Sequence, residues 1–366
     1  MTYKEALFFI GKCLTISLEA KNKKEIEREL KSGNMDWDAV VKVSTAHYVF
    51  PALYCNLNRA AFLHYLPEEL VNYMIHITDL NRERNKQIIE QAKEINELLL
   101  ANNITPIFLK GTGNLLEGLY EDIAERMVGD IDFIVSKKEF KIVPNILKKN
   151  GYYENELSGV YPPNFRHYPR LLNSNKISAV EVHQEMIEYP FAIHFNYNNI
   201  INSIKVTEYD CYVLNSCNQI TSTILAKQLN DNWYSFKIFD LRSQYDIFLL
   251  SLKENQAISP KKESIFFKEL NSFLAIGILL FNNPTSMKYE KNQEVISYMK
   301  SLLFLIERPK YKNFRKNILT FFYFLKLTSL LILKSIYNKK YRIYLKAKIM
   351  DISFLKRKLG FTPQNA

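Results

Sequence analysis

The spacing of apolar residues changes abruptly near Ile104, and this change limits the folds open to the chain. Over residues 1–100 apolar positions recur at intervals of three and four, which predicts consecutive helices. From Ile104 the apolar runs become short and rich in β-branched and aromatic residues, as in ITPIFLKG and VGDIDFIV. Beyond Ile200 the helical spacing returns. The pattern predicts an α+β fold in which helical regions flank a small mixed β-sheet core.

We expect four regions along the 366 residues. They are an N-terminal helical region at 1–100, an α/β core at 101–200, a C-terminal helical region at 201–307 and a basic amphipathic helical tail at 308–366. Only 10 Gly and 12 Pro are present, which means few tight turns and favours a helix-rich chain. Within the core, the segments Phe165–Leu172 and Ile177–His183 are predicted to form strands in addition to the two runs above.

Basic residues are concentrated at the C-terminal end. The formal net charge is +11, yet residues 308–366 alone hold 15 Lys or Arg against the single acid Asp351. Within this tail, Ile318–Tyr337 is mostly apolar, but Lys326 and Lys334 interrupt it, which argues against a transmembrane span. A packed amphipathic helix with a solvated basic face is one interpretation of the tail. Contact with RNA or with an anionic membrane surface is the other.

The cysteines and the first residues suggest a compartment. Cys13, Cys55, Cys211 and Cys217 lack C-x-x-C spacing, so neither a zinc site nor a disulfide framework is predicted. Acidic residues interrupt the signal-peptide pattern in the first 27 residues, which read as a first helix instead. We therefore expect a cytoplasmic protein, with peripheral attachment to a membrane as an alternative.

Two acidic residues give the strongest chemical signal. Asp130 and Asp132 lie two apart in the predicted strand GDIDFIV, so their side chains share one face and both can reach one metal site. Mg²⁺ prefers carboxylate oxygens, and nucleotidyl transfer uses such ions to activate the attacking oxygen and stabilise the leaving group. An isolated Asp-x-Asp is weak, because such pairs also mark solvated turns.

The order of the neighbouring residues strengthens this signal. An apolar strand is followed by Lys110, Gly111 and Thr112, a helix, Arg126, and then the acidic strand. A glycine followed by a hydroxyl residue lets backbone N–H groups approach a triphosphate at a helix N-terminus. Lys110 and Arg126 are expected to contact phosphate oxygens as well, although a lysine beside a glycine turn is often only solvated.

With these elements in order, the segment FLKGTGNLLEGLYEDIAERMVGDIDFIV resembles the polymerase-β-like nucleotidyltransferase superfamily, and more closely its uncharacterised bacterial branch. The likeness extends over roughly residues 35–250. It implies a glycine turn, a basic residue before the acids, a metal-binding acidic pair and a third carboxylate on a later strand. In this sequence these are Gly111 with Thr112, Arg126, Asp130 with Asp132, and Glu181.

Three other residues leave alternatives open. Glu185 would share the face of Glu181 if the strand continued, so either glutamate could supply the third carboxylate. His183 lies between them and is expected to be a structural histidine near the site, because imidazole suits softer metals than Mg²⁺. Asp246, in a downstream helix, is expected in a salt bridge or helix-capping role, with orientation of the nucleotide or acceptor as the alternative.

The resemblance implies a metal-dependent nucleotidyltransferase. Asp130, Asp132 and Glu181 would hold two Mg²⁺ ions, with Mn²⁺ as an alternative. ATP or another nucleoside triphosphate would supply the monophosphate, and the acceptor hydroxyl would belong to a small molecule, a protein or RNA. Two other classes remain open. One is a non-catalytic nucleotide-, RNA- or membrane-binding module that keeps the core, and the other is a purely structural helical scaffold.

Overall fold

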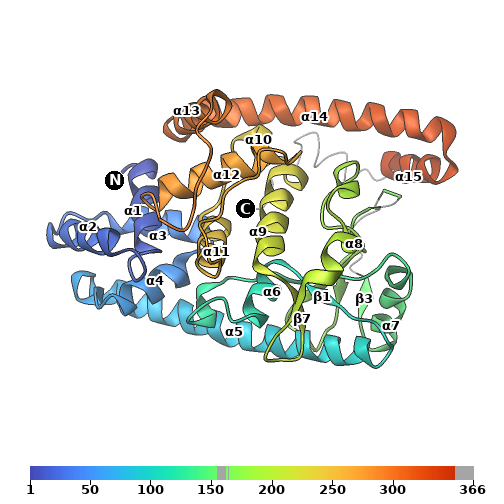
Figure 1. Cartoon of the computed structure of the whole chain (residues 1–366), viewed down its shortest axis with the longest axis horizontal. Coiled ribbons are helices and arrows are strands. Elements are labelled where there is room, and N and C mark those ends of the chain that lie inside the picture. Colours follow the sequence, from blue (N-terminus) through green and yellow to red (C-terminus); the bar gives the residue numbers. More distant parts are fainter. Residues whose placement is uncertain (155–161, 164, 351–366) are drawn as a thin grey trace.

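Helices from both ends of the chain surround a mixed sheet. The computed structural model describes residues 1–154, 162–163 and 165–350. The N-terminal helices are α1 (Tyr3–Cys13), α2 (Ala20–Lys31), α3 (Trp37–Ala46), α4 (Phe50–Arg59) and α5 (Glu68–Leu100). The C-terminal helices are α9 (Ser216–Leu225), α10 (Trp233–Phe236), α11 (Leu241–Leu252), α12 (Phe267–Leu280), α13 (Gln293–Glu307), α14 (Pro309–Tyr337) and α15 (Lys339–Met350). In Figure 1, α5 and α14 run along opposite edges of the molecule.

The sheet and its short helices lie between these groups. In chain order they are β1 (Ile107–Phe108), α6 (Lys110–Leu116), β2 (Asp130–Ile134), α7 (Val143–Lys149), β3 (Tyr153–Glu154), β4 (Leu171–Leu172), β5 (Ala179–His183), α8 (Tyr197–Ile200), β6 (Ile204–Val206) and β7 (Tyr212–Leu214). The strand order is β3-β4-β5-β2-β1-β7-β6. The pairs β2–β5 and β1–β7 are parallel and the others antiparallel. The predicted α+β class, with helices flanking a mixed sheet, is confirmed.

The sheet extends further along the chain than the sequence predicts. β6 and β7 lie beyond Ile200, where a return to helix is expected, so the sheet ends at Leu214. Each of these strands has three residues. Three residues are too few to show a two-residue alternation that differs from a helical pattern. The strands form because β7 pairs along β1, a contact between segments about a hundred residues apart.

The two faces of the sheet are covered unequally. The larger apolar core joins the N-terminal helices, α9 to α13 and the sheet face that carries Phe108, Ile131 and Phe133. A smaller cluster covers the opposite face and includes Ile107 and Ile134. Because side chains alternate along a strand, Asp130 and Asp132 share the face of Ile134. The predicted metal pair therefore lies on the less covered side of the sheet.

Buried amides of α5 fix the segments that lead into the central strands. The Asn85 side chain donates to the carbonyl of Arg126 at 2.7 Å, just before β2. The Gln91 side chain both donates to and accepts from the backbone of Ser178, at 2.9 and 3.1 Å, just before β5. Buried polar groups are stable only when paired in this way. A single long helix therefore sets where both acidic strands begin.

His47 connects three parts of the helical region. Its Nδ1 accepts a hydrogen bond from the Leu241 backbone N–H at 3.1 Å, so the ring proton lies on Nε2, which contacts the Tyr3 hydroxyl at 2.7 Å. Burial lowers the pKa of His47 to about 4. Protonation of Nδ1 would remove the acceptor for Leu241 at the start of α11.

We expect the free energy of unfolding to fall as the pH falls from 6.5 towards 4. The unfolded chain protonates His47 near its ordinary pKa of about 6.5, whereas the folded chain does so only near 4, so the unfolded state binds more protons in this window. At about 1.4 kcal/mol per pH unit, His47 accounts for roughly 2 kcal/mol between pH 7 and pH 5. Urea unfolding of the parent and of His47→Gln at both pH values measures this share. An equally steep decline in the variant would assign the effect to other groups.

Candidate metal and nucleotide site

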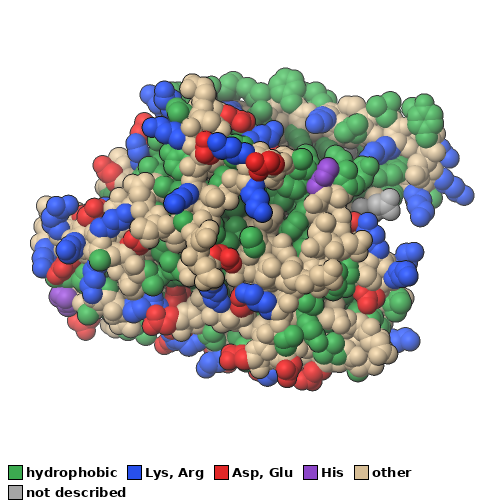
Figure 2. All heavy atoms as spheres, viewed as in Figure 1, with side chains coloured by type: hydrophobic (Ala, Val, Ile, Leu, Met, Phe, Trp, Pro, Cys, Tyr) green, Lys and Arg blue, Asp and Glu red, His purple; other side chains and the backbone are tan. Residues whose placement is uncertain are grey.

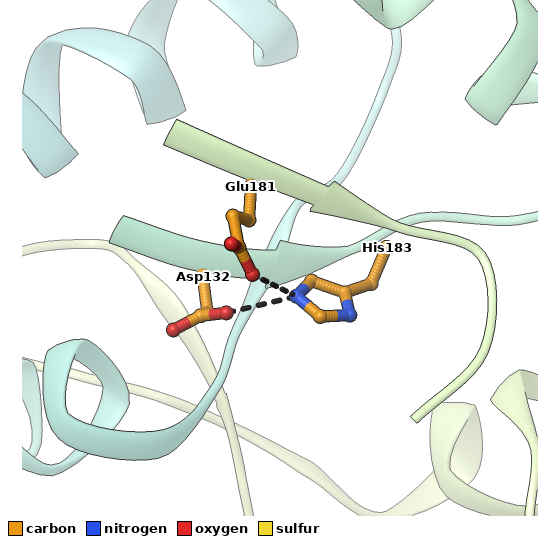
Figure 3. A group of neighbouring side chains, drawn as sticks. All are labelled: Asp132, Glu181 and His183. Atoms are coloured by element: carbon orange, nitrogen blue, oxygen red, sulfur yellow. Dashed lines mark hydrogen bonds and ion pairs between the residues drawn. The ribbon is translucent and has the colours of Figure 1, made fainter. Parts of the chain in front are cut away.

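The register of two parallel strands brings the predicted acids together. β2 pairs with β5 so that Asp132 lies directly across from Glu181, and Ile134 across from His183. Residues two apart on a strand share a face, so Asp130 and Asp132 on β2 point to the same side as Glu181 and His183 on β5. Figure 3 shows Asp132, Glu181 and His183 converging from the two neighbouring strands.

Asp132 is the centre of this group. Its Oδ1 lies 2.8 Å from His183 Nε2 and 2.5 Å from Lys110 Nζ. The same His183 nitrogen is 3.6 Å from Oε2 of Glu181. Potential ligand atoms of Asp132, Glu181 and His183 all lie within 4.8 Å of one another, and all three residues are buried. A single divalent cation could contact all three, so the cluster is compatible with a metal site.

Arg170 is a site residue that the sequence analysis missed. Its Nη2 lies 2.6 Å from Asp130 Oδ2, and its Nε donates to Glu181 Oε1 at 2.9 Å. The antiparallel pairing of Leu171 with Val180 places Arg170 beside Glu181. The only sequence signal for this residue is its place within the predicted strand Phe165–Leu172. The guanidinium bridges two carboxylates, while about half of its side chain stays exposed.

The three carboxylates differ in how easily they ionise. Burial raises the pKa of Asp130 to about 6, and the nearby Arg170 only partly opposes this. Burial also acts to raise the pKa of Asp132, but Lys110 and His183 outweigh it, so the pKa lies below its ordinary value. The pKa of Glu181 is likewise lowered, because His183, His167 and other cationic or donor groups outweigh its burial. At neutral pH the cluster is therefore predominantly anionic.

The turn that begins α6 is strained at Lys110. This residue has φ of 52°, in the left-handed region that residues other than glycine rarely adopt. The conformation costs roughly 1 kcal/mol and often occurs at functional sites. The preceding Leu109 N–H donates to the Asp132 carbonyl at 2.9 Å, which ties the turn to β2. The strained backbone thus aims the Lys110 ammonium at the acidic cluster.

Two glycines allow α6 to lie against the sheet. A Cβ on Gly111 would be 3.0 Å from Val128 Cγ2 and 3.3 Å from Arg126 Nη2. A Cβ on Gly113 would be only 2.8 Å from the Phe108 carbonyl oxygen. Gly111 is a predicted site residue and Gly113 is not, because the constraint on Gly113 comes from Phe108, a neighbour that the local sequence pattern does not reveal.

Thr112 and Arg126 are occupied by contacts within the protein. The Thr112 hydroxyl is buried and donates to the Asp130 carbonyl at 3.1 Å. Arg126 donates through Nε to Asp246 Oδ2 at 3.0 Å and through Nη1 to the Met127 carbonyl at 2.8 Å. Asp246 therefore takes the salt-bridge role expected for it. The phosphate contacts expected of Thr112 and Arg126 stay predictions.

The part of the chain that carries this site matches a known protein family. A family model described as "Uncharacterised nucleotidyltransferase" matches residues 33–265, well over half of the chain. The chain belongs to this nucleotidyltransferase family. Its matched span includes the turn at Lys110, both acidic strands and Asp246, whereas α14 and α15 lie outside it. No curated protein and no solved structure matches the chain.

Within this member of the nucleotidyltransferase family, the two candidate glutamates have different surroundings. β5 ends at His183, so Glu185 lies past the strand, and its Oε1 pairs with Lys137 Nζ at 2.6 Å. Glu181 instead faces Asp132 across the strand pair. The geometry thus brings Glu181, and not Glu185, to the acidic pair.

The charge of the cluster also fits a divalent cation. Asp130, Asp132 and Glu181 contribute three carboxylates, whereas the lysine and arginine that pair with them are Lys110 and Arg170, and the His183 imidazole also contacts two of them. Like charges held this close are unfavourable unless cations neutralise them. In addition, His183 Nδ1 is buried without a hydrogen-bond partner within the protein. The oxygen-rich donor set and the excess of negative charge suit a divalent cation that prefers oxygen ligands.

Proposed function

We propose that this chain transfers a nucleoside monophosphate from a nucleoside triphosphate to an acceptor hydroxyl and releases pyrophosphate. One observation carries the proposal. In a chain of the nucleotidyltransferase family, Asp130, Asp132 and Glu181 share one face of two paired strands beside the strained turn at Lys110. Carboxylates grouped next to a lysine are the arrangement that metal-assisted transfer to phosphorus requires.

Asp130, Asp132 and Glu181 would hold the metal, with His183 at its edge. Their oxygens favour Mg²⁺, and the neighbouring imidazole nitrogen makes Mn²⁺ the alternative. Two bound ions would supply charge neutralisation at the triphosphate and lower the pKa of the acceptor hydroxyl. Ligand atoms of Asp132, Glu181 and His183 lie within 4.8 Å of one another, and Asp130 shares their face of the sheet.

The basic residues would position the triphosphate. Lys110 and Arg170 pair with the carboxylates, but their side chains are about 33% and 48% exposed, so both can turn towards phosphate oxygens. Gly111 would contact phosphate through its backbone alone, because Val128 and Arg126 occupy the space that a Cβ would fill. Thr112 and Arg126 would support the phosphate site from inside the protein. Thr112 donates to the Asp130 carbonyl, and the Arg126 guanidinium lies against Gly111.

The transfer itself exchanges one bond to phosphorus for another. The acceptor oxygen forms a bond to the α-phosphorus, and the bond from that phosphorus to the oxygen bridging the β-phosphorus breaks. Pyrophosphate leaves with the electron pair of the broken bond. The proton of the acceptor hydroxyl passes to a carboxylate of the cluster or to solvent.

Labelled nucleotides test this function. Purified protein is incubated with a cell extract and ATP, CTP, GTP or UTP that carries label on the α-phosphate, in Mg²⁺ or in EDTA. We expect an acceptor to gain label from at least one nucleotide in Mg²⁺ and none in EDTA. The γ-labelled nucleotide should leave the acceptor unlabelled. Label from the γ-position alone would identify a phosphotransferase, and no label from either position would count against catalysis.

A further inference from the structure

An apolar stripe on α14 is left uncovered by the described parts of the chain. Its members follow the three- and four-residue spacing of one helix face, and each is between 39% and 62% exposed: Ile318, Phe321, Phe322, Leu325, Ile332, Leu333 and Ile336. Ser335 is the only side chain of α14 that is buried. Figure 2 shows hydrophobic side chains gathered along the edge of the molecule that α14 forms. We call these seven residues the α14 stripe.

One face of α14 contacts the rest of the protein. On this face Phe324 and Leu331 are partly buried and Ser335 is buried, and Arg342 of α15 donates to the Ser335 carbonyl at 3.1 Å. Near its start, α14 is held by Arg315, which donates to the carbonyls of Ser235 and Phe236. The α14 stripe therefore lies outside the face of α14 that contacts α15 and the body.

A continuous stripe of this size differs from scattered apolar residues on a surface. Single exposed hydrophobic side chains are ordinary in soluble proteins, but a contiguous apolar patch marks a surface that binds something. At 1.5 Å per residue, the 29 residues of α14 extend about 44 Å. A partner must cover a long, narrow apolar surface.

The charge around the stripe limits what the partner can be. Residues 308–350 contain 12 Lys or Arg and no Asp or Glu. A second copy of this chain would bring the same positive charge against it. RNA would supply negative charge but no apolar layer for the aliphatic and aromatic side chains. An anionic phospholipid bilayer supplies phosphate groups and an acyl-chain layer in one plane.

We propose that α14 and α15 dock this protein on an anionic phospholipid bilayer, with α14 lying in the plane of the membrane. The α14 stripe enters the boundary between headgroups and acyl chains. Lys326 and Lys334, together with the basic residues of α15, contact lipid phosphates. The catalytic sheet then faces the aqueous side, next to the membrane surface.

The contacts at both ends of this helical pair favour docking in the plane. By length and composition, α14 is the one helix of residues 1–154, 162–163 and 165–350 that could cross a membrane. The sequence predicts no span there, because of Lys326 and Lys334. Arg315 near its start and Tyr341 in α15 both contact the body, the latter through a hydrogen bond to the Pro163 carbonyl at 3.2 Å. Spanning would carry Tyr341 to the opposite side of the bilayer and break this contact.

Vesicle flotation of the full-length protein tests the proposal. Vesicles contain phosphatidylcholine alone or with about one third phosphatidylglycerol, and the variant Phe321→Asn, Leu325→Asn, Ile332→Asn removes apolar contacts from the stripe. We expect the parent to float with the anionic vesicles and much less with the neutral ones. The stripe variant should partition at least about tenfold less, because each lost side chain removes apolar area from the membrane.

A matched control places the same substitutions elsewhere. Leu80, Val206 and Ile265 are 56% to 60% exposed on the body, and their triple Asn variant should float like the parent. Because the stripe variant could misfold, Lys326→Glu with Lys334→Glu provides a second test, and it should weaken binding to anionic vesicles only. Circular dichroism checks that each variant is folded.

Four results would overturn the proposal. The parent could fail to float with anionic vesicles, or the folded stripe variant could float as well as the parent. A parent dimer that the stripe substitutions convert to monomer, without any vesicle binding, would assign the stripe to a second copy. Retention of the parent in membranes washed with alkaline carbonate would identify a spanning helix instead of a docked one.

Discussion

Replacing Asp132 by Asn is expected to lower nucleotide transfer by on the order of 100- to 1,000-fold. Asp132 is the residue that Lys110 and His183 both contact and that faces Glu181 across the strand pair. The amide keeps the shape of the side chain but removes the negative charge that a divalent cation requires. The readout is label transferred from an α-labelled nucleoside triphosphate at saturating Mg²⁺.

The fold should survive this substitution. Lys110 would lose its partner, but its side chain is about one third exposed, so water can solvate the ammonium. Glu181→Gln should cause a loss of similar size. Glu185→Gln is the matched control, because that carboxylate pairs with Lys137 outside the cluster, and it should keep transfer near the parent level. The opposite order of the two glutamate variants would make Glu185 the third carboxylate.

Replacing Arg126 by Met is expected to lower the free energy of unfolding by about 3 to 5 kcal/mol. Arg126 and Asp246 form an ion pair in which both side chains are buried, at 9% and 2% exposure. Removing the guanidinium leaves Asp246 with the Tyr120 hydroxyl, which donates to it at 2.7 Å, as its remaining hydrogen-bond donor among the described contacts. An uncompensated buried charge is the costly outcome. Urea unfolding at pH 7 measures the loss.

A second arginine separates structure from catalysis. Arg170 also pairs with carboxylates, but about half of its side chain is exposed, so Arg170→Met should change stability by less than about 1 kcal/mol. It should nevertheless reduce transfer. The double variant Arg126→Met, Asp246→Leu should recover much of the lost stability, because no charge is then buried alone. If Arg126→Met were as stable as the parent and only raised the KM for nucleotide, Arg126 would be a phosphate ligand instead.

Local periodicity was sufficient to place Asp130 and Asp132 on one face of a strand. Asp130 and Asp132 share a face because strand side chains alternate, and this rule applies to any strand. The register that sets Glu181 opposite Asp132 comes instead from the pairing of two strands about fifty residues apart. The family resemblance supplied the third carboxylate, and the geometry brings that residue to the pair.

The basic part of the site depends on contacts across the fold. Arg170 reaches Asp130 only because β4 pairs with β5, and the sequence around it gives no sign of that pairing. The position of Arg126, four residues before Asp130 in the sequence, predicts a phosphate ligand. Its partner Asp246 lies 120 residues later, in α11. A local pattern cannot show that a charge is already neutralised by a distant residue.

The limits of the sheet were also hidden from the sequence. β6 and β7 are short, and their neighbours α8 and α9 have helical spacing, so the region after Ile200 reads as continuous helix. For the basic tail at 308–366, the sequence showed the composition but not which residues are exposed. Its apolar and basic residues were clear from composition, but the structure was needed to show that the α14 stripe is exposed.

Calorimetric titration of the parent and of Asp130→Asn, Asp132→Asn with a nucleoside triphosphate, in Mg²⁺ and in EDTA, tests the central claim most directly. The claim is that the carboxylates of β2 and β5 hold a divalent cation that receives the triphosphate. We expect the parent to bind nucleotide in Mg²⁺ and to lose that binding in EDTA, and the variant to bind in neither. Mg²⁺-dependent binding by the variant that is as tight as binding by the parent would contradict the claim.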